Sequence, residues 1–370
     1  MARDFLFGET ILWAGRPTVL RTPPAFRVAA WVAAVVSAST LAFAVVVARG
    51  LGGHVGGMLA FSAWCAMLAL GAWRVPLWWA SGVEYLVTDR HVIWRRGRLR
   101  RSIARDSISF ARIHWHEGTT HGVGDLILVR AVPTGALRRT LKLTLAGVEA
   151  PDRVWALVRG VEPCAPLGDG ARPLAQRLDE GERVLWTAIP VSSPWSARRV
   201  AGALAGLLLF VLAIHSVVRV ARPVHDVLRT HALGPVVAAI FVAGVSLGVL
   251  LLVAAGLLFG YGALVRPAML ARSTRYFVTN RRVLIQRGRE ELLLDRSRIA
   301  YVIATPARRS VHDVFLVLDG PQARALAASG AFESNRRDTL APVFAAIEDP
   351  EAVGAILSPS SRDHEEKAAA

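Results

Sequence analysis

Four long stretches of the chain contain almost no polar side chains. They cover residues 28–48, 51–73, 200–218 and 232–265, and none of them contains Asp, Glu, Lys or Arg. About 20 consecutive apolar residues are needed to span the hydrocarbon core of a bilayer, and helices of a soluble core rarely stay uncharged for so long. The pattern therefore predicts four transmembrane helices, arranged as two hairpins.

The polar regions that follow these hairpins carry the short, alternating pattern of β-strands. In the first region the pattern predicts strands over residues 84–88, 91–95, 98–108, 113–115, 126–129 and 141–145, and a helix over 152–159. In the second it predicts strands over residues 275–279, 282–286, 290–299 and 314–318, a loop over 320–338 and a helix over 350–357. An antiparallel sheet with one apolar face needs a cover for that face. We therefore expect each region to be a meander closed by its C-terminal helix.

The chain also repeats itself at long range. GETILW at residues 8–13 returns as GERVLW at 181–186, and YLVTDRHVI at 85–93 returns as YFVTNRRVL at 276–284. LAGVEAPD at 145–152 has a weaker counterpart, FAAIEDPE, at 344–351. The order is kept while the connecting lengths vary, which indicates two copies of one domain plan rather than an array of short units.

These observations predict a modular order along the chain. We expect an N-terminal segment (1–25), a transmembrane hairpin (26–80), a first module (81–162), a linker with the repeated entry motif (163–197), a second hairpin (198–266), a second module (267–358) and a disordered tail (359–370). The tail is polar, as chain ends without packing usually are.

Composition and charge give this order an orientation. Of the 370 residues 53% are hydrophobic, the mean hydropathy is +0.40 and the formal net charge is +16. The first hairpin is flanked by Arg16, Arg21, Arg27, Arg74 and Arg90, whereas its turn holds only Arg49. Loops rich in Arg stay in the cytoplasm, so we expect both chain ends on the cytoplasmic face of the inner membrane. The second turn also carries arginines, at 219, 222 and 229, so its hairpin is oriented by the polar segment that both hairpins share.

Arginines cluster in the strand regions, where they could meet anionic lipid. The candidates for head-group contact are Arg90, Arg95, Arg96, Arg98, Arg281, Arg282, Arg287 and Arg289. Alternate strand residues share a face, so Arg96, Arg98 and Arg100 are expected along one rim. Guanidinium groups bind phosphate with paired hydrogen bonds, and a basic residue near the surface adds about 1 kcal/mol of attraction. The same charges also fit cytoplasmic retention or protection of a strand edge.

A motif shared by both regions gives the chain a family resemblance. The pattern Tyr-x-Val-Thr-Asp/Asn-Arg-x-Val, followed by a turn glycine, occupies residues 85–97 and 276–288. Each time it comes after a predicted transmembrane hairpin and downstream of Gly-Glu-x-x-Leu-Trp. In these features the chain resembles the bacterial pleckstrin-homology-like (PH-like) membrane proteins. The resemblance implies two cytoplasmic PH-like antiparallel β-barrels, each capped by a C-terminal helix, and a membrane-associated role without catalysis.

Other classes of function find less support in the sequence. We find no nucleophile elbow, phosphate loop, dinucleotide fingerprint or nucleic-acid reader motif, so we expect no enzyme, no cofactor and no nucleic-acid partner. His114, His116, His121 and Glu117 have residue types that zinc prefers, but the second copy has no histidines there and we expect no metal. We expect the modules to dock proteins or contact anionic phospholipids, with self-association as a further possibility.

The alternative is a transporter or channel in which the modules are regulatory. It needs a polar path between the four spans, and Ser37, Ser39, Thr40, Ser62 and Ser246 are the residues that would have to converge. Since polar groups within a bilayer are costly, convergence would indicate function. We expect these side chains to be scattered instead.

Overall fold

The computed structural model describes residues 8–51, 55–116, 122–131, 140–161, 178–179, 181–191, 197–230, 235–308, 311–318 and 340–357. The predicted loop 320–338, the tail 359–370, Glu117 and His121 lie outside them. Internal contacts divide the chain into two compact units. One combines Met1–Arg21, Trp78–Ser192 and Leu270–Ala370, and the other combines Thr22–Leu77 and Ser193–Met269.

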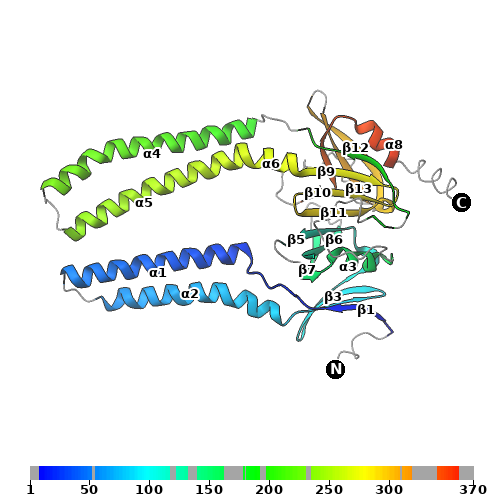
Figure 1. The fold of residues 1–370 in the computed structure, drawn as a ribbon, viewed down its shortest axis with the longest axis horizontal. Helices are drawn as coiled ribbons and strands as arrows, with labels where there is room; N and C mark the ends of the chain where they lie inside the picture. Colours follow the sequence, from blue (N-terminus) through cyan, green and yellow to red (C-terminus); the bar gives the residue numbers. More distant parts are fainter. Residues whose placement is uncertain are drawn as a thin grey trace. The chain divides into compact units, whose positions relative to one another are not determined.

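The long helices follow the four apolar stretches (Figure 1). They are α1 (Pro24–Leu51), α2 (Gly56–Ser81), α4 (Ala197–Thr230) and α5 (Pro235–Gly260), the last continued by a π-helical turn (Tyr261–Val265) and α6 (Arg266–Ser273). In the described part of the chain four helices are long and apolar enough to cross a membrane. The prediction of four apolar helices is therefore confirmed. The second hairpin differs from the prediction in its turn, because Arg219, Arg222 and Arg229, which the sequence predicts in the turn, lie within α4.

Within the helical unit, small and hydroxyl residues allow close contacts. A side chain added at Gly206 of α4 would lie 2.9 Å from the carbonyl oxygen of Gly256 in α5, so this crossing requires glycine. The hydroxyls of Ser37 and Ser62 each donate to the other's carbonyl oxygen at 2.9 Å. Among the path residues whose side chains the structure describes, only these two meet, and the side chain of Ser246 lies outside the described residues. Ser39 and Thr40 bond within their own helix, to the carbonyl of residue 36.

The strands form three antiparallel sheets. The first has the order β1 (Ile11–Gly15), β2 (Glu84–Thr88), β3 (His91–Arg96), β4 (Leu99–Ala104). The second has the order β7 (Thr140–Glu149), β6 (Val123–Ala131), β5 (Phe110–Trp115), β11 (Glu290–Asp295), β10 (Arg282–Arg287), β9 (Thr274–Thr279), β8 (Val184–Ala188). The third has the order β12 (Ile299–Arg308), β13 (Val311–Leu318), β14 (Val343–Ile347). Helices α3 (Pro151–Arg159) and α8 (Pro350–Leu357) follow the last strand of each region.

Two predicted strands, 98–108 and 290–299, are each interrupted by a 3-10 turn, Arg105–Ser107 or Arg296–Arg298. The Arg105 guanidinium donates to the carbonyls of Leu157 and Val158, both at 2.8 Å, at the end of α3. Arg296 donates in the same way to Ile356 in α8. Because a cation satisfies the last carbonyls of a helix, both arginines anchor the closing helices.

The expected pair of closed barrels is not what the described strands form. Strand β5 of the first region pairs with β11 of the second (Figure 1). In this pairing His114 lies opposite Glu290 and Ala111 lies opposite Leu293. One sheet of seven strands therefore crosses the predicted module boundary. Burial explains the fusion. Leu293 packs in the core of the first region, while Phe110 packs in the core of the second.

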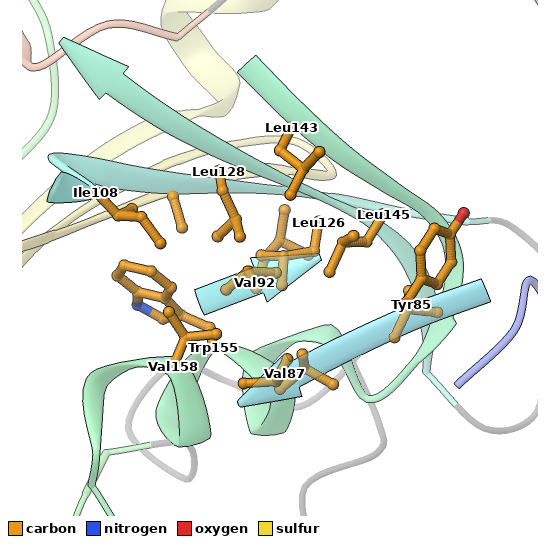
Figure 2. Packing of buried hydrophobic residues seen from close by; sticks show 14 of the residues in the cluster. Tyr85, Val87, Val92, Ile108, Leu126, Leu128, Leu143, Leu145, Trp155 and Val158 are labelled. Carbon is orange, nitrogen blue, oxygen red and sulfur yellow. The ribbon is translucent and has the colours of Figure 1, made fainter. Parts of the chain in front are cut away.

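The first core lies between the strands and α3 (Figure 2). Leu126 and Leu145 are fully buried, and Trp155 of α3 packs into the same core beside Ile108 and Val158. The Tyr85 hydroxyl donates to the Ala146 carbonyl at 3.1 Å and accepts from its N–H at 2.9 Å. A buried hydroxyl needs such partners. Burial raises the pKa of Tyr85 to about 12.

Candidate functional site

The β3–β4 hairpin carries the densest basic charge among the described residues. Its turn is closed by Gly97, whose φ of 53° suits glycine. Arg95 lies opposite Arg100, and Trp94 lies opposite Arg101. Since residues directly opposite share a face, Arg95 and Arg100 lie on one face and Arg101 on the other.

The expected rim of Arg96, Arg98 and Arg100 is therefore corrected. Arg96 lies opposite Leu99 in the register, on the face of Arg101, so Arg96 and Arg100 point to opposite sides. The two-residue turn between the strands causes the difference, because alternation restarts on the second strand. Arg98 lies in the turn and is exposed.

Arg96 stacks on tryptophans in the last turn of α2. Its Cζ atom lies 3.6 Å from the ring centroid of Trp79 and 5.2 Å from that of Trp78. The cation is attracted to the face of each ring. Trp78 and Trp79 remain 69% and 46% exposed, at the end of a helix apolar enough to cross a membrane. Tryptophan is enriched at membrane–water boundaries in general.

The β10–β11 hairpin has a different charge pattern from β3–β4. Residues 282–295 contain three arginines and three carboxylates, whereas residues 91–104 contain five arginines and no carboxylate. Arg287 is bound to Glu290 at 2.7 Å and is largely covered. The second hairpin therefore carries no net charge of its own. The sequence already held this signal in the acidic residues 290, 291 and 295.

Arg282 leaves the candidate surface because it is buried. Its guanidinium donates to both carboxylate oxygens of Glu182 at 2.8 Å, and Thr279 also donates to Glu182, at 2.7 Å. Burial alone would raise the pKa of the Glu182 carboxyl, but the bonds from Arg282 and Thr279 hold the pKa below its ordinary value. The pKa of Arg282, which burial would lower, is raised by the same pair.

The Glu182 pair belongs to a larger ion cluster in the strand unit. Arg159 of α3 contacts Asp179 at 3.3 Å and Asp295 of β11 at 2.7 Å. Buried charges need partners of this kind. The cluster ties the end of α3 to the second region, and we assign it a structural role.

The first region has a smaller version of this cluster. Glu9 accepts a hydrogen bond from Thr88 at 2.7 Å and lies 2.8 Å from Nδ1 of His91. The bond from Thr88, assisted by His91, lowers the pKa of Glu9. His91 holds the position that Arg282 holds in the second region.

The remaining candidates occupy separate places. Arg90 and Arg281 are exposed beside the β2–β3 and β9–β10 turns, Arg95 is half-buried, and Arg289 is exposed. His116 lies 3.0 Å from Asp125, and His114 lies 3.9 Å from Glu290. Among the described residues no three His, Cys, Asp or Glu side chains are grouped as metal ligands.

Comparison with known proteins adds no identity to this geometry. No protein-family model, no curated protein and no solved structure matches the chain.

Proposed function

We propose that the chain is a non-catalytic, multi-pass protein of the cytoplasmic membrane whose β3–β4 hairpin contacts anionic lipid head-groups. In this proposal the four apolar helices span the bilayer and both chain ends are cytoplasmic. The strand regions are two PH-like copies presented at the membrane surface. Four apolar helices and the arginine-flanked first hairpin support the membrane part.

The stack of Arg96 on Trp79 carries the proposal. It holds the β3–β4 hairpin on two tryptophans of the same compact unit, and we place these tryptophans at the membrane surface, where a lipid phosphate would be close. Five arginines near the surface would add several kcal/mol of attraction, at about 1 kcal/mol each. The β10–β11 hairpin lacks this excess charge. We therefore assign lipid contact to the first copy alone.

Matching contacts support the inference of two copies. Tyr276 bonds to the backbone of Ala345 as Tyr85 bonds to that of Ala146. Another matching pair involves aspartates of β6 and β13. Asp125 accepts from the N–H of residue 147 at 2.7 Å, and Asp313 accepts from that of residue 346 at 2.9 Å.

Hydrogen exchange tests the lipid contact in the full-length chain. The protein is placed in nanodiscs of phosphatidylcholine alone or with phosphatidylglycerol. We expect slower exchange over residues 91–104 in the anionic discs, and loss of that difference as salt rises. Replacing Arg95, Arg98 and Arg100 by Gln should abolish the difference.

The matched control is the second hairpin. Arg287→Gln with Arg289→Gln removes two arginines at or beside the β10–β11 turn and should leave the lipid-dependent protection of β3–β4 unchanged. Equal exchange of residues 91–104 in neutral and anionic discs at low salt would refute the head-group contact.

A further inference from the structure

The pairing of β11 with β5 has a counterpart that the described strands do not form. Strand β4 follows the Gly97 turn as β11 follows the Gly288 turn, and β12 follows its 3-10 turn as β5 does. Yet β4 and β12 each end a sheet among the described strands. The strands that correspond to β11 and β5, namely β4 and β12, therefore lie at sheet edges, whereas β11 and β5 pair inside the seven-stranded sheet.

Burial distinguishes the paired edges from the outer ones. The four central residues of β11 are buried, whereas the first four of β4 are exposed. In β5, Ala111, Ile113 and Trp115 are buried. The residues in the same places of β12 are Val302, which is half-buried, and Ala304 and Pro306, which are exposed.

The chemistry of β12 calls for a covering strand. Its segment 302–306 reads Val-Ile-Ala-Thr-Pro and has no charged residue. Uncharged, β-prone edge strands are templates for pairing with another chain, and proteins usually block them with charge. We infer that a second copy of this chain covers the edge, β12 of one chain pairing with β4 of the next.

The β11–β5 pair supplies the register. Trp115 donates its N–H to the carbonyl of Arg289 at 3.0 Å, so every second residue of each strand faces the other strand. Transferred to the outer edges, this register places Leu99 opposite Thr305, Arg100 opposite Ala304 and Ser102 opposite Val302.

No like charges face each other in that arrangement. Pro306 takes the place of Trp115 and has no N–H to donate, so the ladder ends at this residue.

The inferred contact joins two different edges, which makes it head-to-tail. Such a contact closes into a ring or continues as an open chain, according to the rotation between copies. The inference is independent of the lipid proposal, since it depends on backbone edges and not on the arginine charges.

Cysteine cross-linking in native membranes tests the inference on the full-length chain, with Cys65 and Cys164 replaced by Ala. Opposite residues of a non-hydrogen-bonded pair have Cα atoms about 4.5 Å apart, within disulfide range. Leu99→Cys with Thr305→Cys should give covalent multimers on oxidation. Leu99→Cys with Ala304→Cys is one residue out of register and should give at least about tenfold less, because side chains alternate between faces.

Two further variants make the outcome decisive. His114→Cys with Glu290→Cys sits in the equivalent place within the chain and should form an internal disulfide. Adding Ser102→Pro should remove the multimers, because Ser102 corresponds to Leu293, which faces β5, whereas Ser102→Ala should not.

Three results would overturn the inference. The first is an internal disulfide without multimers from Leu99→Cys with Thr305→Cys. The second is equal yields from the pairs at 305 and 304, which would indicate random collision. The third is failure of the internal disulfide, which would remove the β11–β5 register on which the inference is built.

Discussion

At the scale of single residues, one position of the shared motif holds a histidine in the first region and an arginine in the second. His91 and Arg282 each lie three residues after the threonine of the motif, Thr88 or Thr279. Each faces a glutamate from the entry segment. Arg282 is 8% exposed and bound through two nitrogens. The second entry segment is therefore held by a buried ion pair and the first by a smaller, more accessible contact.

Arg282→Gln tests the strength of this pair. The substitution leaves the Glu182 carboxylate buried without its main partner, which typically costs about 3–5 kcal/mol. We expect a clearly lower temperature of unfolding for the solubilised full-length chain, followed by the near-ultraviolet circular dichroism of its tryptophans. His91→Arg changes the matching position and should leave that temperature nearly unchanged. An Arg282→Gln protein as stable as the parent would contradict the structural role.

The pH dependence of stability follows from the lowered pKa of Glu182. A carboxyl whose pKa is lower in the folded state adds stability above its unfolded pKa, about 4.3, and that stability is lost as pH falls through the folded value. We expect the unfolding temperature to fall steeply below about pH 4. In Glu182→Gln this acid-dependent part should be smaller. Parallel pH profiles for the two proteins would exclude Glu182 as the titrating group.

The sequence alone identifies these arginines as candidates for head-group contact, but it does not show which of them are exposed and which are buried. Arg281 and Arg282 are neighbours of the same type, yet one is exposed and the other buried. The partner that decides the difference, Glu182, lies 100 residues away in the chain. The residues next to Arg282 in the sequence do not indicate a contact with a residue so far away in the chain. The charge excess of β3–β4 over β10–β11, in contrast, is visible by counting.

At the scale of elements, the two regions close their last strand differently. Gly147 and Ala346 both have a left-handed backbone, with φ of 61° and 55°. Thr18 donates its N–H to the Gly147 carbonyl at 2.8 Å, and Val191 does so to Ala346 at 2.8 Å. The entry segments therefore dock on corresponding turns, but the first turn has no room for a side chain at Gly147, whereas the second holds alanine at 346.

Exchanging these small residues gives a matched pair of predictions. Gly147→Ala places a methyl against the carbonyl of Val19 and adds a left-handed penalty of about 1–2 kcal/mol. Ala346→Gly removes that penalty and should leave stability unchanged or slightly higher. Unfolding temperatures of the two full-length variants measure the difference. A stability loss in Ala346→Gly greater than in Gly147→Ala would reverse the expected order.

Most of the strands were predictable from alternation, and the misses have physical causes. The sequence predicts β1 and β8 only as entry motifs and does not predict β12 or β14. A five-residue strand such as β1, β8 or β14 gains its definition from a distant partner. For β1 that partner is β2, about 70 residues later. The interruption before β5 and β12 depends on Arg105 and Arg296 reaching helices α3 and α8. Neither contact leaves a local signature.

At the scale of the whole molecule, the seven-stranded sheet makes the two regions interdependent. An isolated second region, residues 270–357, lacks both β8 and β5. It would expose Leu284 and Leu293, which pack in the first core. Exposed apolar edges of this kind favour aggregation.

We expect the isolated fragment to lose the amide protection that β10 and β11 show in the full-length chain. Hydrogen exchange with mass spectrometry reports that protection strand by strand. Co-expression of residues 1–177 with residues 178–370 is the control, and should restore protection because the β5–β11 contact is not covalent. A fragment as protected as the intact chain would show that the second region folds alone.

The β5–β11 pairing also has a consequence for synthesis. His114 and Glu290 are paired, yet about 180 residues separate them. At roughly 5–20 residues per second, β5 leaves the ribosome some 10–35 seconds before its partner exists. Helices α4 and α5 are made in that interval. A nascent chain must therefore carry an open strand edge while two more apolar helices emerge, and at that stage a neighbouring nascent chain can compete for the edge.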